Sequence, residues 1–133
     1  MEEVIVYTDG ASRGNPGPAG IGVMLCTREG KILREISEYA GELTNNAAEY
    51  LAVIRGLEEA HDLQAKKAVV VTDSELLVRQ MKGMYKVKHQ GLRELHERVK
   101  QQARRFEKVG FVHIRRERNT RADELAKKGS KAK

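Results

Sequence analysis

VIVYTDGASRGNPGP, residues 4–18, is the stretch of this chain that decides the fold. Its first half alternates toward a strand over residues 3–9, and the strand is expected to end at Asp9, before a loop rich in glycine and proline. A second strand ends in the same way, because VVVTDS at residues 69–74 places Asp73 after a continuous valine-rich run. Ligands gather at the carboxyl ends of parallel strands in α/β sheets, so we expect both carboxylates at one edge.

Hydrophobic periodicity predicts strands and helices in the order βββαβααβα. The first three strands are typical of antiparallel hairpins, whereas helical crossovers favour parallel pairing. We expect an α/β fold with a mixed sheet flanked by helices, in one domain spanning residues 1–133. The expected strands are 3–9, 19–27, 31–39, 67–72 and 110–115, and the expected helices are about 47–62, a short one after Asp73, 92–106 and one from Asn119 or Thr120.

Composition indicates a globular protein with a basic surface. Apolar residues make up 40% and charged residues 33% of the 133, and the formal net charge is +6, with most of the excess beyond residue 78. A basic flank beside acids suits a polyanionic substrate, although a solvated surface that aids solubility is the alternative. Cys26 is the only cysteine, and no membrane span or signal peptide is expected, so we predict a cytoplasmic protein.

Four acidic residues lie at the junctions between predicted elements. Asp9 and Asp73 follow strands, and Glu49 and Asp123 each fall one turn into a predicted helix. Four carboxylates at one sheet edge repel each other unless a divalent cation neutralises them, and carboxylate oxygens suit the hard Mg²⁺ ion. The pattern therefore predicts a hard-metal site.

Helix capping is the alternative explanation for these acids. Asp123 lies three residues after Thr120, which fits a capping box, and Glu49 lies three after Asn46. Asp73 suits the cap of the short helix that follows it, and Asp9 suits a turn. The joint pattern favours the metal site, because four independent caps have no reason to share an edge.

Four motifs together resemble the type 1 ribonuclease H family over essentially the whole chain: DGASRGNPGP at 9–18, TNNAAE at 44–49, TDS at 72–74 and ADELA at 122–126. The resemblance implies a ribonuclease H-like fold with a five-stranded mixed sheet. It implies endonucleolytic hydrolysis of the RNA strand of RNA–DNA hybrids, leaving 3′-OH and 5′-phosphate ends, with Mg²⁺ or Mn²⁺. The catalytic and metal-ligating acids carried over by motif are Asp9, Glu49, Asp73 and Asp123.

A two-metal mechanism needs a bridging carboxylate with others beside it. Asp9 is expected to coordinate both ions as the bridge. Glu49 and Asp73 are expected to complete the coordination of one ion and Asp123 to coordinate the other, with two ions per site when substrate is bound. One ion is expected to activate the attacking water and the other to stabilise the departing 3′ oxygen.

Recognition of RNA depends on the ribose 2′-OH. The family pattern implies nucleic-acid contacts at Asn15, Asn45 and Asn46, and a phosphate contact at Thr44. The alternative is that Asn15 serves its turn and that Asn45 caps the helix.

Two segments depart from common forms of the family. The chain has no tryptophan, and a short segment at 81–88 replaces a basic protrusion. Tyr85 is expected to stack on substrate and Lys86 and Lys88 to contact phosphates, although Tyr85 suits the core equally well. We therefore expect weaker substrate affinity.

The loop before Asp123 lacks the histidine that a common form of the family carries. His113 is interpreted as a structural residue of the last strand. Arg116 is the expected replacement, as a cation near the departing phosphate.

The leading hypothesis is an endoribonuclease acting on hybrids as a monomer. The alternatives are a nuclease of the same fold that also cleaves double-stranded RNA, and a hybrid-binding module with weak or no cleavage. The presence of all four acids argues against a module without catalysis.

Overall fold

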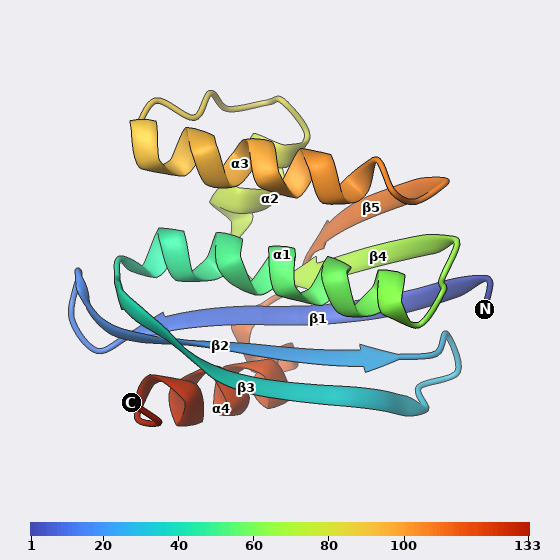
Figure 1. Ribbon diagram of the computed structural model, residues 1–133, viewed down its shortest axis with the longest axis horizontal. Coiled ribbons are helices and arrows are strands. Elements are labelled where there is room, and N and C mark those ends of the chain that lie inside the picture. The colour runs from blue at the N-terminus through green and yellow to red at the C-terminus, as the bar shows by residue number, and fades with distance from the viewer.

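The computed structural model describes residues 1–133 as one five-stranded mixed sheet with helices packed on it (Figure 1). The element order βββαβααβα is as predicted, and the strand order across the sheet is β3-β2-β1-β4-β5. The strands are β1 Glu3–Ser12, β2 Gly17–Cys26, β3 Ile32–Leu43, β4 Lys67–Thr72 and β5 Lys108–His113. The α-helices are α1 Asn45–Asp62, α2 Glu75–Met81, α3 Gln90–Ala103 and α4 Thr120–Ser130, with a 3₁₀ turn at Arg116–Arg118 before α4.

The three N-terminal strands are antiparallel, and β4 and β5 extend the sheet in parallel from β1. Parallel pairing of β1 with β4 ends where Thr8 faces Thr72. β1 itself continues to Ser12, because β2 still pairs with it as far as Ala19. The prediction that the first strand ends at Asp9 was therefore wrong for the strand as a whole, but right for its parallel edge.

The core lies between the sheet and α1, with α3 beside α1 (Figure 1). Alternate residues of β1, among them Val4 and Val6, are fully buried there, together with Val70 of β4 and Leu57 of α1. Full burial of such a side chain stabilises the fold by about 1.5–3 kcal/mol. This packing stabilises β1 and β4, the two central strands that position Asp9 and Asp73.

Glycines bring two helices into main-chain contact with the sheet. A Cβ atom on Gly10 would overlap the main chain of Ala48 and Glu49 in α1. On the other face, Gly20 and Gly22 of β2 stand in the same relation to α4. Substituting any of these glycines requires a helix to move, so the glycines fix where the acids on α1 and α4 are held.

The remaining differences from the predicted elements are at their ends. The third helix ends at Ala103 rather than near residue 106, and Phe106 packs into the core from beyond the helix end. The 3₁₀ turn was not predicted, since three residues carry too little pattern to be recognised. No helix is long and apolar enough to cross a membrane.

Candidate active site

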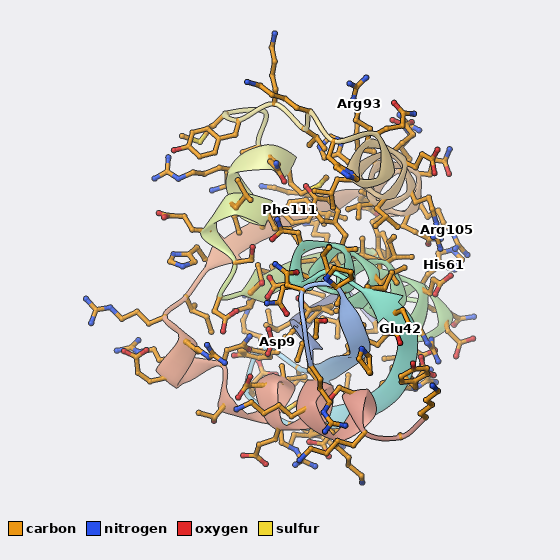
Figure 2. All side chains as sticks on the ribbon, turned by 90° about the vertical axis from the view of Figure 1, so that its left-hand side faces the viewer. Asp9, Glu42, His61, Arg93, Arg105 and Phe111 are labelled. Carbon is orange, nitrogen blue, oxygen red and sulfur yellow. The ribbon has the colours of Figure 1, made fainter.

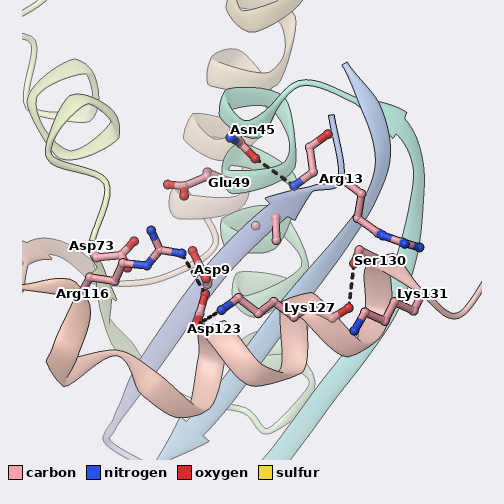
Figure 3. A pocket seen from close by; sticks show the side chains of 13 residues that line it. Asp9, Arg13, Asn45, Glu49, Asp73, Arg116, Asp123, Lys127, Ser130 and Lys131 are labelled. Carbon is pink, nitrogen blue, oxygen red and sulfur yellow. Dashed lines mark hydrogen bonds and ion pairs between the residues drawn. The ribbon is translucent and has the colours of Figure 1, made fainter. Parts of the chain in front are cut away.

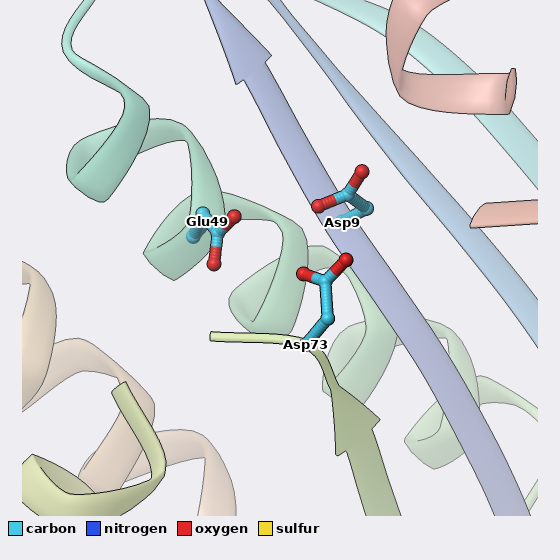
Figure 4. A group of neighbouring side chains, drawn as sticks. All are labelled: Asp9, Glu49 and Asp73. Carbon is cyan, nitrogen blue, oxygen red and sulfur yellow. The ribbon is translucent and has the colours of Figure 1, made fainter. Parts of the chain in front are cut away.

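The parallel register of β1 and β4 sets Asp9 beside Asp73. Each residue directly follows one member of the Thr8–Thr72 pair, and α1 brings Glu49 to the same place. One carboxylate oxygen from each of the three lies within 4.8 Å of the others (Figure 4). Opposite ligands of a Mg²⁺ ion stand about 4 Å apart, from metal–oxygen distances near 2.1 Å. The spacing of the three carboxylates therefore fits a shared cation.

Electrostatics indicate the same need for positive charge. Burial, followed by the charges of Glu49 and Asp73, raises the pKa of Asp9 to about 9. Burial and the charge of Asp73 raise the pKa of Glu49 to about 7, and burial also raises the pKa of Asp73. The buried Oε2 atom of Glu49 has no hydrogen-bond partner. A partnerless buried carboxylate oxygen is what a site for a hard cation presents, and the residues present fit such an ion.

Asp123 stands beside these three acids with cations of its own. Its two carboxylate oxygens face the guanidinium of Arg116 at 3.6 Å and the Nζ atom of Lys127 at 3.1 Å (Figure 3). Partial burial acts to raise the pKa of Asp123, but the hydrogen bond with Asp9 and the charges of Lys127 and Arg116 outweigh it and lower that pKa. Asp123 is therefore held ionised next to an Asp9 that resists ionisation.

All four acids line one groove of about 520 Å³. Its floor is the end of β1 from Asp9 onward, and its walls are the first turns of α1 and the length of α4 (Figure 3). In Figure 2 the label of Asp9 shows where the groove lies, between the sheet and α4. It is on the other side of the molecule from the hydrogen-bonded pair His61 and Arg105. The expected convergence of the four acids is thus what the structure has.

The capping explanation for the acids was wrong, because other side chains take the caps. Thr44 is the N-cap of α1, where its side chain accepts a hydrogen bond from the Ala47 amide. Asn45 therefore does not cap that helix, and Asn46 and Glu49 form no capping box. Ser74, and not Asp73, caps α2. The N-cap of α4 is Asn119, without a capping side-chain bond, so Thr120 and Asp123 form no capping box. The carboxylates are left free for another role.

The four predicted RNA contacts line a groove that meets the acidic groove at Asn45. Asn45 lines the acidic groove and also a second groove of about 730 Å³, which includes Asn15, Thr44 and Asn46. The Oδ1 atom of Asn45 accepts from the Ser12 amide at 2.8 Å, and that of Asn15 accepts from the Asn45 amide at 3.1 Å. With these oxygens engaged, the side chains of Asn15 and Asn45 each have their NH₂ group as the remaining donor.

Tyr85, Lys86 and Lys88 lie elsewhere, in a groove of about 540 Å³ formed with α2 and α3. Tyr85 is 50% exposed, and the Arg79 guanidinium lies 5.4 Å from its ring centre. The alternative that Tyr85 belongs to the core was therefore wrong. The structure does not bring these three residues to the acids.

Arg116 and His113 differ in position. Arg116 lines the acidic groove, as expected of a cation beside the acids. His113 lies in the last strand, as predicted, but that strand ends at His113 and not at residue 115, and the side chain of His113 is exposed and does not line that groove.

Sequence reasoning missed two residues of the site. Lys127 lies one turn after Asp123, a spacing at which helical side chains meet, and that spacing was a usable signal. Asn119 is buried and donates from Nδ2 to the main-chain oxygen of Thr8 at 2.9 Å. No local pattern announces this bond, because its partners are separated by 111 positions.

Comparisons with known proteins agree with this geometry. The family model described as "Reverse transcriptase-like" matches residues 7–129. The "Bifunctional protein Rv2228c" of Mycobacterium tuberculosis is 43% identical over 93% of this chain, which spans only 34% of that relative's length. The "Ribonuclease H" of Ruegeria pomeroyi is 33% identical over 98% of this chain and 94% of its own. The crystal structure of LC11-RNase H1 in complex with RNA/DNA hybrid is 47% identical, with a TM-score of 0.92 and 96% coverage of both chains.

The mixed sheet with carboxylates at the end of its parallel edge is an α/β fold of the ribonuclease H class. With matches to ribonucleases H that cover nearly the full length of both chains, the chain belongs to the type 1 ribonuclease H family.

Proposed function

We propose that the protein is a metal-dependent endoribonuclease that hydrolyses the RNA strand of RNA–DNA hybrids, leaving 3′-OH and 5′-phosphate ends. The carrying observation is the cluster of Asp9, Glu49 and Asp73, whose oxygens lie within 4.8 Å of one another in an open groove. Support also comes from the hybrid-bound LC11-RNase H1, to which this chain is 47% identical. Because the chain spans a third of the length of some relatives, its activity is inferred from the site.

Asp9, Glu49, Asp73 and Asp123 would hold the divalent cations, and their all-oxygen character favours Mg²⁺, with Mn²⁺ as its substitute. When bound there, such cations supply an activated water and neutralise the departing 3′ oxygen. Asp9 is the proposed shared ligand, since it is the acid whose pKa is affected by all three others, Glu49, Asp73 and Asp123.

Arg116 is proposed to stabilise charge on the phosphate as the bond breaks. Its guanidinium lies 3.6 Å from Asp123 and is 73% exposed, so it is free to approach a bound strand without leaving the groove. Lys127 holds the other oxygen of Asp123 and keeps that carboxylate oriented toward the groove.

Discrimination of RNA is proposed to reside in the NH₂ groups of Asn15, Asn45 and Asn46, which can donate to ribose 2′-hydroxyls. Thr44 keeps a free hydroxyl proton for a phosphate, because its Oγ1 accepts the capping bond. Tyr85, Lys86 and Lys88, in their own groove, are proposed to hold the DNA strand. The protein is proposed to act as a monomer, and its single buried Cys26 suits a reducing cytoplasm.

The test compares labelled hybrid, duplex DNA and duplex RNA with Mg²⁺, with Mn²⁺ and with a chelator. We expect cleavage of the hybrid alone, and only with metal. Cleavage of duplex RNA would establish the broader nuclease in place of the hybrid-specific one. Asp9→Asn and Asp73→Asn should each abolish cleavage and retain hybrid binding, and cleavage unaffected by both substitutions would overturn the proposal.

A further inference from the structure

The acidic groove carries two cations at its other end. Arg13 and Lys131 line it beyond the floor and along α4, on the side away from Asp73 and Arg116 (Figure 3). Four residues of extended chain separate Asp9 from Arg13, roughly 13 Å at 3.3 Å per residue. Eight residues along α4 separate Asp123 from Lys131, roughly 12 Å at 1.5 Å per residue. The groove therefore has an acidic end and a basic end about 12–13 Å apart.

Neither basic side chain is used inside the protein. Arg13 and Lys131 are exposed and take part in no salt bridge, whereas Lys127, between them and the acids, is engaged by Asp123. A cation at the end of a helix is favoured by the helix dipole, which accounts for Lys131. It does not account for Arg13, which belongs to the β1–β2 loop.

Both cations are attached to parts of the fold that cannot shift easily. The Arg13 amide donates to the Pro18 oxygen at 2.8 Å, which closes the loop across its base. Near Lys131, a Cβ on Gly129 would lie 2.5 Å from the Glu38 oxygen of β3, so the end of α4 is seated on the sheet. Between the two ends, the floor residues Gly10, Ala11 and Ser12 are small and leave the groove open.

We propose that Arg13 and Lys131 bind backbone phosphates of the strand that is cleaved, beyond the scissile phosphate. This proposal rests on the proposed function, which sets one phosphate at the acids. Every nucleotide carries a phosphate, so a strand that follows the floor of the groove brings further phosphates to its basic end. A guanidinium binds phosphate through two parallel hydrogen bonds, and an ammonium group adds a point charge.

The test measures hybrid binding in the Asp9→Asn background, so that no cleavage intervenes. Fluorescence anisotropy between about 50 and 200 mM salt gives the slope of log affinity against log salt, to which each phosphate contact contributes about 0.7–0.9. We expect Arg13→Ala with Lys131→Ala to reduce the slope by about 1.5. The matched control is Lys31→Ala with Lys128→Ala, which removes two exposed charges outside the groove, one of them from the same last turn of α4. The control slope should equal that of the parent.

The strand is identified with neutral methylphosphonate linkages placed in either strand of the hybrid. When the phosphates of the RNA strand are neutral around the target site, the double variant should bind with the same affinity as the parent. The charged phosphates that Arg13 and Lys131 would bind are then absent for both proteins. With the DNA strand neutralised, the difference should persist. An unchanged slope, or a difference that vanishes only with the neutral DNA strand, overturns the proposal.

The two proposals fail in distinguishable ways. If wild-type protein with Mg²⁺ leaves the hybrid intact, the proposed function fails, while the slopes still decide whether the basic end contacts phosphate. If the hybrid is cleaved and the slopes of variant and parent coincide, only the contact at Arg13 and Lys131 is wrong.

Discussion

The side chain of Asn119 is joined to the main chain of Thr8 by a buried hydrogen bond of 2.9 Å. Thr8 directly precedes Asp9, and Asn119 directly precedes the helix that carries Asp123. The bond therefore ties the two segments that bring Asp9 and Asp123 together.

Replacing Asn119 with Ala should destabilise the fold and lower activity. An unsatisfied buried carbonyl typically costs about 1–3 kcal/mol, which denaturant unfolding measures. We also expect a lower kcat, because the segment bearing Arg116 and Asp123 loses its attachment. The exposed neighbour Thr120→Ala is the control and should leave stability within about 0.5 kcal/mol. An Asn119→Ala protein with wild-type stability would contradict the role given to this bond.

Asp9→Asn should stabilise the metal-free protein while abolishing cleavage. The folded pKa of Asp9, about 9, lies above the ordinary value, so ionisation of Asp9 disfavours the folded state. In chelator, wild-type stability should therefore fall as the pH rises from about 4 toward 9, and the Asn variant should lack that contribution. At pH 8 we expect a gain of at least about 1 kcal/mol, or roughly 2–8 °C in Tm. Equal pH profiles for the two proteins would rule out this repulsion.

Gly10→Ala should move α1 away from β1. The added methyl group overlaps the main chain of Ala48 and Glu49, and overpacking of this kind costs about 1–3 kcal/mol. Cleavage should fall further than stability, since Glu49 shifts with the helix. Gly110→Ala in β5 is the matched control, because its methyl group meets no atom within 4 Å. Should both variants cleave equally well, the packing at Gly10 would not govern the site.

Arg116→Ala should lower turnover on a hybrid by about 10-fold. Removing a buried hydrogen-bond donor that stabilises a transition state lowers kcat by about 10²–10³, and we expect less here because the Arg116 guanidinium is exposed. Arg116→Lys should recover part of the rate, since it keeps the charge without the planar donor. Single-turnover kinetics at saturating Mg²⁺ measures the effect on the chemical step. Wild-type turnover in Arg116→Ala would remove Arg116 from catalysis.

Lys86→Ala with Lys88→Ala should reduce the salt slope of hybrid binding by about 1.4–1.8, as expected for two phosphate contacts. These residues lie in the groove between α2 and α3, so methylphosphonates in the DNA strand, and not in the RNA strand, should cancel the effect. An unchanged slope would exclude both lysines from the binding surface.

The sequence was sufficient for those parts of the site that follow from strand ends and helical spacing. The valine-rich run before Asp73 and the alternation before Asp9 were enough to predict that two carboxylates share an edge. What escaped prediction depends on contacts across long separations. The Asn119–Thr8 bond and the use of Asn15 and Asn45 oxygens by main-chain amides have no local signature.

Taken one acid at a time, the sequence could not exclude the capping alternative, for a local reason. An acid near a helix start is compatible both with capping and with a free carboxylate, and the spacing of Glu49, Asp73 and Asp123 does not separate the two. The side chains that take the cap at α1 and α2, Thr44 and Ser74, are hydroxyl residues in or beside the same motifs. Pattern alone could not assign the hydrogen bond to one polar neighbour over another.

The glycine contacts of α4 have a consequence for how this protein tolerates change. Because Gly20 and Gly22 seat the helix directly on β2, and the Asn119 bond to Thr8 holds its first turn, the position of α4 does not depend on the loop between Ile114 and Arg118. Insertions or deletions between Ile114 and Arg118 can then be absorbed as a different loop path without displacing Asp123. Substitutions in that loop should therefore change its chemistry while the fourth carboxylate stays in place.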